Sequence, residues 1–119
     1  MDTNAHDKTA TIRDQNDRFR ARDASVPGRI MLTRGVQDLI ASEARATQEG
    51  LLRAIKDFYD FTPDNDPHGL HDFGGFKFVG QNLFWKIDLY DHEYRYGSSQ
   101  PENLWKTRRV LTVMLPEEY

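Results

Sequence analysis

The chain has 119 residues, of which 38% are hydrophobic and 29% are charged, and its formal net charge is -3. This length suits one domain with a single core. Because there is no cysteine, the composition excludes disulfides, thiolate zinc sites and cysteine nucleophiles, and the acidic balance argues against chain-wide affinity for phosphates.

The N-terminus is polar and lacks the apolar stretch of a signal peptide. No apolar run approaches the roughly 20 residues of a membrane span. We therefore expect a cytoplasmic protein with a flexible segment at residues 1–10 and a single domain over residues 11–119.

A helix is predicted over Thr11–Asp23, where opposite charges recur at i,i+4. Its apolar content is thin and rests mainly on Ile12 and Phe19, with Asn16 between them on the same stripe. Two interpretations remain open: a helix docked through two anchors, or an arm that orders on a partner.

A breaker at residues 25–28 precedes a short strand over Arg29–Thr33. Thr33 is placed to cap a helix that begins near Val36. Gly50 is expected to separate this helix from a second one. The second helix carries one apolar face that should pack on the sheet, formed by Leu51, Leu52, Ile55, Phe58 and Tyr59.

Prolines at positions 63 and 67 predict a loop over Thr62–Gly69. Alternating apolar residues predict strands over residues 73–79, 83–90 and 107–115, with a turn at residues 80–82 and a long polar connection over residues 91–106. The expected fold is α+β, with an antiparallel sheet of three to four strands and the helices on one face. In this scheme the strand over Arg29–Thr33 would be the fourth, at the edge.

Five segments together resemble domain-of-unknown-function family 3768, small proteins of alphaproteobacterial chromosomes and plasmids. They are I-R-D-Q-N-D-R-F-R at 12–20, G-R-I-M-L-T-R-G-V at 28–36, F-T-P-D-N-D-P-H-G-L-H-D-F-G at 61–74, F-W-K-I-D-L-Y-D at 84–91 and T-R-R-V-L-T-V-M-L-P-E-E-Y at 107–119. The resemblance implies a bacterial protein often carried on mobile elements and supplies no activity. Leu70 stands where the family usually has Glu.

The first candidate site is a metal site in the loop over residues 64–72. Asp64, Asp66 and Gly69 imitate the start of a calcium loop, but Gly75 stands where the bidentate Glu is required. A transition metal held by His68 and nearby His or carboxylate groups, notably His71, Asp72 and Asp88, is the second option. The third is that these residues only form turns through their own backbone.

The second candidate is an acid/base pair in which His68 or His71 is polarised by Asp72 or Asp88. On the same strand, Lys86 could instead neutralise Asp88. The chain has no nucleophile elbow, phosphate loop or dinucleotide fingerprint, so the enzyme interpretation is the weaker one. No cofactor is predicted.

Two further candidates concern binding surfaces. The first is a nucleic-acid surface, in which Trp105 could stack on a base and the cations beside it could neutralise phosphates. These cations are Lys106, Arg108 and Arg109. The predicted protein interface combines loop aromatics, a basic residue and an acidic rim, namely Tyr94, Tyr96, Trp105, Arg108, Asp64 and Asp66.

The leading hypothesis is a non-enzymatic protein that binds a protein partner. The mobile-element association implied by the family makes an inhibitor of a host defence or regulatory complex the specific form of this hypothesis. The alternatives are a metal- or His/Asp-dependent hydrolase that uses residues 64–72, and a nucleic-acid-binding accessory protein.

Overall fold

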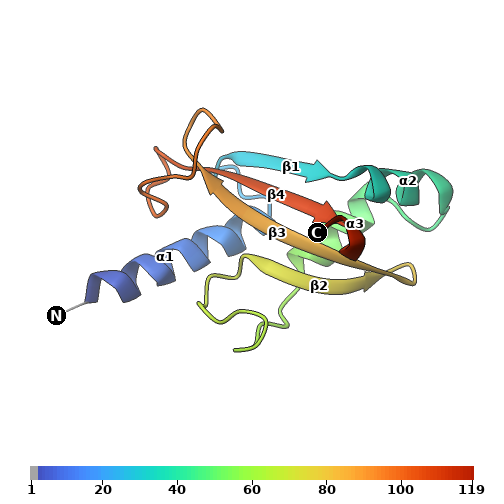
Figure 1. The fold of residues 1–119 in the computed structure, drawn as a ribbon, viewed down its shortest axis with the longest axis horizontal. Helices are drawn as coiled ribbons and strands as arrows, with labels where there is room; N and C mark the ends of the chain where they lie inside the picture. The colour runs from blue at the N-terminus through green and yellow to red at the C-terminus, as the bar shows by residue number, and fades with distance from the viewer. Residues whose placement is uncertain (1–2) are drawn as a thin grey trace.

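The computed structural model, described here for residues 3–119, has three α-helices and a four-stranded sheet (Figure 1). The helices are α1 (Thr3–Arg20), α2 (Arg34–Ser42) and α3 (Gln48–Lys56), and the short 3-10 turn η1 (Pro116–Glu118) follows the last strand. The strands are β1 (Gly28–Leu32), β2 (Phe73–Phe78), β3 (Gln81–Tyr90) and β4 (Arg108–Met114). This confirms the predicted α+β class. No described helix is long and apolar enough to cross a membrane.

The sheet is mixed, which corrects the expectation of a purely antiparallel sheet. Its strand order is β1-β4-β3-β2, and the β2–β3 and β3–β4 pairs are antiparallel. β1 is the edge strand that was predicted, but it pairs in parallel with β4, with Ile30 opposite Leu111. Strand periodicity reveals which side chains share a face and carries no information about the direction of the neighbouring strand, so the parallel pair was not predictable from the pattern.

The core lies between the helices and one face of the sheet. Alternate residues of the central strands, Trp85 and Ile87 in β3 and Leu111 and Val113 in β4, are buried there as predicted. The helices complete the core with Phe19, Val36, Leu51 and Ile55. Figure 1 shows α3 behind the sheet and the C-terminal turn in front of it.

Several predicted boundaries were wrong at helix ends. α1 begins at Thr3, whereas the prediction began at Thr11. Gly50 does not separate two helices, because it lies in the first turn of α3, where its backbone N–H donates to the N-cap Thr47 Oγ1 over 3.0 Å. The two helices are separated earlier, by the non-helical residues 43–47. α3 ends at Lys56, so Tyr59 lies beyond the helix and is 88% exposed instead of packing on the sheet.

The β2–β3 turn is formed by Val79 and Gly80, whereas the prediction placed it at residues 80–82. Both have positive φ, 45° and 82°, as a two-residue type I′ hairpin requires. A β-branched residue rarely adopts such a φ. The sequence Val-Gly therefore does not predict a two-residue turn, whereas Asn-Gly at the same place would. The tight turn fixes the register that places Phe76 opposite Leu83.

Candidate functional site

The loop over residues 61–72, here called the acidic loop, is fastened to α1. Arg13 Nη1 donates to the carbonyl oxygen of Gly69 over 3.0 Å, and Asn16 Nδ2 donates to that of Leu70 over 2.8 Å. Because positions 13 and 16 are three residues apart, both side chains leave the same side of the helix. The loop therefore has a fixed shape set by α1, which makes the docked helix, and not a free arm, the observed arrangement.

Arg20 continues this stripe into the core. Its Nη1 donates to the carbonyl oxygens of Ile55 and Phe58 over 2.7 and 2.9 Å, and its guanidinium lies 5.2 Å from the ring centroid of Phe61 and 5.0 Å from that of Trp85. The side chain is buried. Arg20 thus ties the end of α3 and the start of the acidic loop to α1.

His71 is enclosed by carboxylates and an aromatic ring. Its Nδ1 lies 2.8 Å from Asp17 Oδ1 and its Nε2 lies 3.7 Å from Asp66 Oδ2. The ring of Phe61 stacks on one imidazole face, with centroids 3.8 Å apart and an interplanar angle of 4°. Both ring nitrogens therefore face a carboxylate, Nδ1 at hydrogen-bonding distance and Nε2 beyond it. The contact between His71 and Asp17 fastens the loop to α1.

The polar residues of the acidic loop bond to its own backbone. Asp66 Oδ1 accepts from the backbone N–H groups of Leu70 and His71 over 3.0 and 3.2 Å, and the Asp66 side chain is only 7% exposed. Asn65 Oδ1 accepts from the N–H of Thr62 over 2.8 Å. These are the turn contacts of the third option for this loop. Among the side chains described, no group of three or more His, Asp or Glu could hold a metal ion.

Among the described residues, none of the remaining catalytic candidates is hydrogen-bonded to or ion-paired with His71. Asp72 does lie close enough to His68 and Asp88 to sense their charges. His68 is exposed on the loop, and Asp88 forms an ion pair with Lys86 over 2.8 Å, the neutralised alternative considered from the sequence. Burial, reinforced by the nearby charges of Asp66 and Asp88, raises the pKa of the Asp72 carboxyl. The carboxylates beside His71 are Asp17 and Asp66, and not the predicted Asp72 or Asp88.

The residue that sequence reasoning missed is Asp17. The stripe of polar residues at positions 13, 16, 17 and 20 of α1 was a usable signal, because polar side chains on the side of a helix that also carries its apolar anchors need buried partners. What the sequence could not provide was the partner, which lies more than fifty residues away in the acidic loop.

The predicted basic cluster for nucleic acid is divided by the sheet. Arg109 is fully buried, where its Nε donates to Asn16 Oδ1 over 2.7 Å and its Nη2 donates to Gln15 Oε1 over 3.0 Å. Burial lowers the pKa of Arg109 to about 10. Strand alternation turns Arg108 to the opposite face, so only Arg108 and the exposed Lys106 remain at the surface.

The polar connection over residues 91–106, here called the aromatic loop, presents the predicted interface aromatics. Trp105 is 88% exposed and Tyr96 is 72% exposed. Tyr94 lies against the edge strand, with the Arg29 guanidinium 3.8 Å from its ring centroid. Beside Trp105 is a hollow of about 250 Å³, whose lining residues are Ser25, Pro27, Leu104, Trp105 and Arg108.

The aromatic loop has no helix or strand but is internally bonded. Thr107 Oγ1 lies 2.8 Å from Ser98 Oγ and donates to the carbonyl oxygen of Gln100 over 2.8 Å. Asn103 Oδ1 accepts from the backbone N–H of Trp105 over 2.9 Å. The exposed indole is therefore mounted on a fixed support. Figure 1 shows this loop and the acidic loop at separate places on the molecule.

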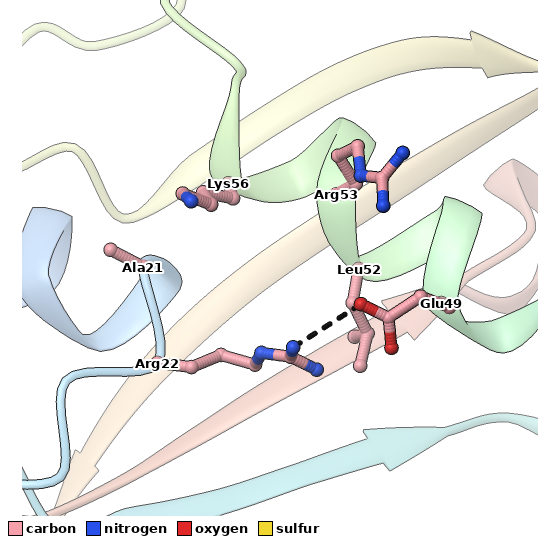
Figure 2. A pocket seen from close by; sticks show the side chains of 6 residues that line it. All are labelled: Ala21, Arg22, Glu49, Leu52, Arg53 and Lys56. Carbon is pink, nitrogen blue, oxygen red and sulfur yellow. Dashed lines mark hydrogen bonds and ion pairs between the residues drawn. The ribbon is translucent and has the colours of Figure 1, made fainter.

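A second hollow, of about 190 Å³, lies between the end of α1 and α3 (Figure 2). Arg22 crosses it to Glu49, with Nη2 3.3 Å from Oε1. Figure 2 shows Arg53 and Lys56 pointing in different directions, so the cationic groups do not converge on one point. This geometry is that of a solvated, mixed-charge helix surface.

Comparison with known proteins gives one match. A family model described as "Protein of unknown function (DUF3768)" matches residues 32–118. No curated protein and no solved structure matches the chain.

Proposed function

The chain belongs to the DUF3768 family, whose description states no activity, and we propose from its surface that it is a binding module for a protein partner. The observation that carries the proposal is Trp105, an almost fully exposed indole beside an apolar hollow. Tryptophan is the residue most enriched among the energetically dominant contacts of protein interfaces.

The physical argument rests on preorganisation. An exposed indole on a mobile loop would lose conformational entropy when a partner orders it, which weakens binding. Here the hydrogen bonds of Ser98, Asn103 and Thr107 already order the loop. The apolar surface of Trp105 stays in water in the free protein, and a partner side chain that enters the adjoining hollow would remove it from water.

The hydrolase alternative has less support. His71 has both ring nitrogens next to carboxylates and a face against Phe61. A general base requires a nitrogen that can reach a substrate proton. His71→Ala should therefore loosen the acidic loop without removing the proposed binding activity.

Affinity capture with the tagged chain, followed by reconstitution with the purified partner, tests the proposal. Trp105→Ala should raise the measured Kd by roughly 30-fold or more, since a dominant aromatic contact contributes about 2 kcal/mol or more to binding. Tyr59→Ala is the matched control, because Tyr59 is equally exposed at 88% but lies beyond α3, outside the aromatic loop. Equal binding by the wild-type protein and the Trp105→Ala variant would refute this docking surface.

The specific form of the proposal is inhibition of a host defence or regulatory complex. It requires that the reconstituted partner belongs to such a complex and loses activity when the chain binds. A captured partner whose activity is unchanged would leave the binding function and remove the inhibitory one.

A further inference from the structure

One face of the sheet, here called the open face, has no α-helix of the described residues packed on it. The core side chains of the four strands all point to the helices, so the alternate residues point to the other side. On β3 these are Phe84, Lys86, Asp88 and Tyr90. Among the described residues outside the strands, Tyr94 of the aromatic loop lies against Arg29 on this face. The turn η1 and Tyr119 also reach it, and the Tyr119 ring packs against Phe73 and Phe84.

On the strands of this face, cationic residues outnumber acidic ones. The chain has 19 Asp and Glu residues, and within the described strands only Asp88 belongs to them. Strand alternation places four cationic residues on the open face: Arg29, Lys77, Lys86 and Arg108. Lys86 is paired with Asp88. Arg29, Lys77 and Arg108 have no acidic partner among the described residues, although Arg29 stacks on Tyr94 and Arg108 donates to the carbonyl oxygens of Leu104 and Thr107. A chain with a net charge of -3 thus carries a basic sheet face.

Apolar anchor points alternate with these charges. Phe73 and Phe84 are half-buried, with ring centroids 5.1 Å apart. Two hollows flank them: one of about 310 Å³ lined by Lys86, Met114, Glu118 and Tyr119, and one of about 420 Å³ beside Lys77 and Phe84. The face is therefore a shaped surface with recesses beside its cationic groups, and Glu118 lies at the rim of one of them.

The open face is continuous with the Trp105 surface. Arg108 lines the hollow beside Trp105 and, as the first residue of β4, also stands opposite Tyr90 on the open face. Resting on the proposed function, we infer that the partner of this chain is a protein whose docking segment is acidic and carries apolar side chains. The segment would run from the Trp105 hollow across the open face.

The observations favour an acidic protein segment over single-stranded nucleic acid. Strands of nucleic acid bind by stacking bases on free ring faces. On the open face itself, Tyr119 meets Phe73 and Phe84 edge-on, at interplanar angles of 85° and 89°, so these three rings pack on one another. A free ring face is present at Trp105, in the adjoining aromatic loop. The chain's overall charge of -3 would also repel an extended phosphate backbone. An acidic side chain needs only the local cations.

The test uses the full chain as the target for selection from a random library of displayed peptides. The peptides have about ten residues, which is long enough to cross the sheet when extended. The expected result is enrichment of peptides that combine several Asp or Glu with Leu, Phe or Trp. Synthetic versions of the selected peptides should bind the double variant Arg29→Glu/Lys77→Glu about tenfold or more weakly than the wild-type protein. Added NaCl should weaken their binding to the wild-type protein.

Lys56→Glu is the control variant, because Lys56 lies in α3 in the helical layer and is exposed there, away from the open face. It makes a single charge reversal away from the open face and should leave affinity unchanged. Circular dichroism of each variant establishes that it is folded, which is expected because Arg29 and Lys77 are exposed.

The outcomes separate the two proposals. Peptides that require Trp105 but are neutral or basic, or that tolerate Arg29→Glu/Lys77→Glu, would overturn the acidic-partner inference and keep the binding function. Selection of no peptide that depends on Trp105 would count against both. Binding of single-stranded oligo(dT) that competes with the selected peptides and is abolished by Lys77→Glu would reassign the face to nucleic acid.

Discussion

Gly74 lies where β2 passes over the rings of Trp85 and Phe58, and its replacement by Ala should destabilise the fold. A Cβ atom at this position would lie 2.4 Å from Trp85 Nε1, 2.7 Å from Trp85 Cε2 and 2.8 Å from Phe58 Cζ. Trp85 is fully buried, and Phe58 packs edge-on against it with centroids 5.6 Å apart. Neither ring can move aside without disturbing the core.

The magnitude follows from two opposing effects. Overpacking a well-filled core costs about 1–3 kcal/mol. Replacing Gly by Ala stabilises by about 0.4–1 kcal/mol, through the lower entropy of the unfolded chain, where the backbone tolerates a side chain. With contacts well below 3.0 Å to two rings, the upper part of the cost range applies, and we expect Gly74→Ala to lose about 2 kcal/mol.

Gly75→Ala is the matched control on the next residue of the same strand. Its Cβ would point to the open face, with its nearest contact the Phe84 ring at 3.3 Å. The clash is slight, so the entropic gain should nearly offset it and the change should stay within about 0.5 kcal/mol. The free energy of unfolding is measured by urea titration followed by tryptophan fluorescence. Equal destabilisation by the two substitutions would refute the assignment of the two faces of β2.

Three further predictions concern single side chains. Arg20→Met should lower the free energy of unfolding by about 2 kcal/mol or more in urea titration, because the carbonyl oxygens of Ile55 and Phe58 lose a charged donor. Arg22→Met, at the surface, is the control and should change it by less than about 0.5 kcal/mol. Thr47→Ala should cost about 1 kcal/mol through loss of the α3 N-cap, and a cost near zero would contradict that role. Folding raises the pKa of Asp72, so the native state loses stability as pH rises through that pKa and the carboxyl ionises. Asp72→Asn should therefore be more stable than wild type at pH 7 and should lose this advantage in acid. Thermal unfolding measured across pH tests this.

The sequence was sufficient for the strands and for the core face of each. The alternation of Leu83, Trp85 and Ile87 against Phe84, Lys86 and Asp88 has the two-residue period of a strand, and the structure buries the first set as predicted. The aromatic loop was likewise readable, because residues 91–106 lack any apolar period and contain Gly-Ser-Ser and Pro.

The candidate site depended on information that periodicity does not contain. His68, His71, Asp72 and Asp88 were grouped because they are close in sequence or share a strand, yet the carboxylates that meet His71 are Asp17 and Asp66. Asp17 belongs to a helix fifty-four residues earlier, and no local pattern specifies that contact. The burial of Arg109 has the same origin, since its amide partners are on α1.

What the sequence by itself determined is therefore local: strand faces, loop positions, the absence of thiol chemistry and the resemblance to a family. The tertiary structure alone decided three long-range matters, which are the parallel docking of β1 on β4, the fastening of the acidic loop by α1 and the gathering of cationic residues on the open face. The physical reason is that side-chain period reports which way a residue points from its own element, whereas partners across the fold depend on how whole elements pack.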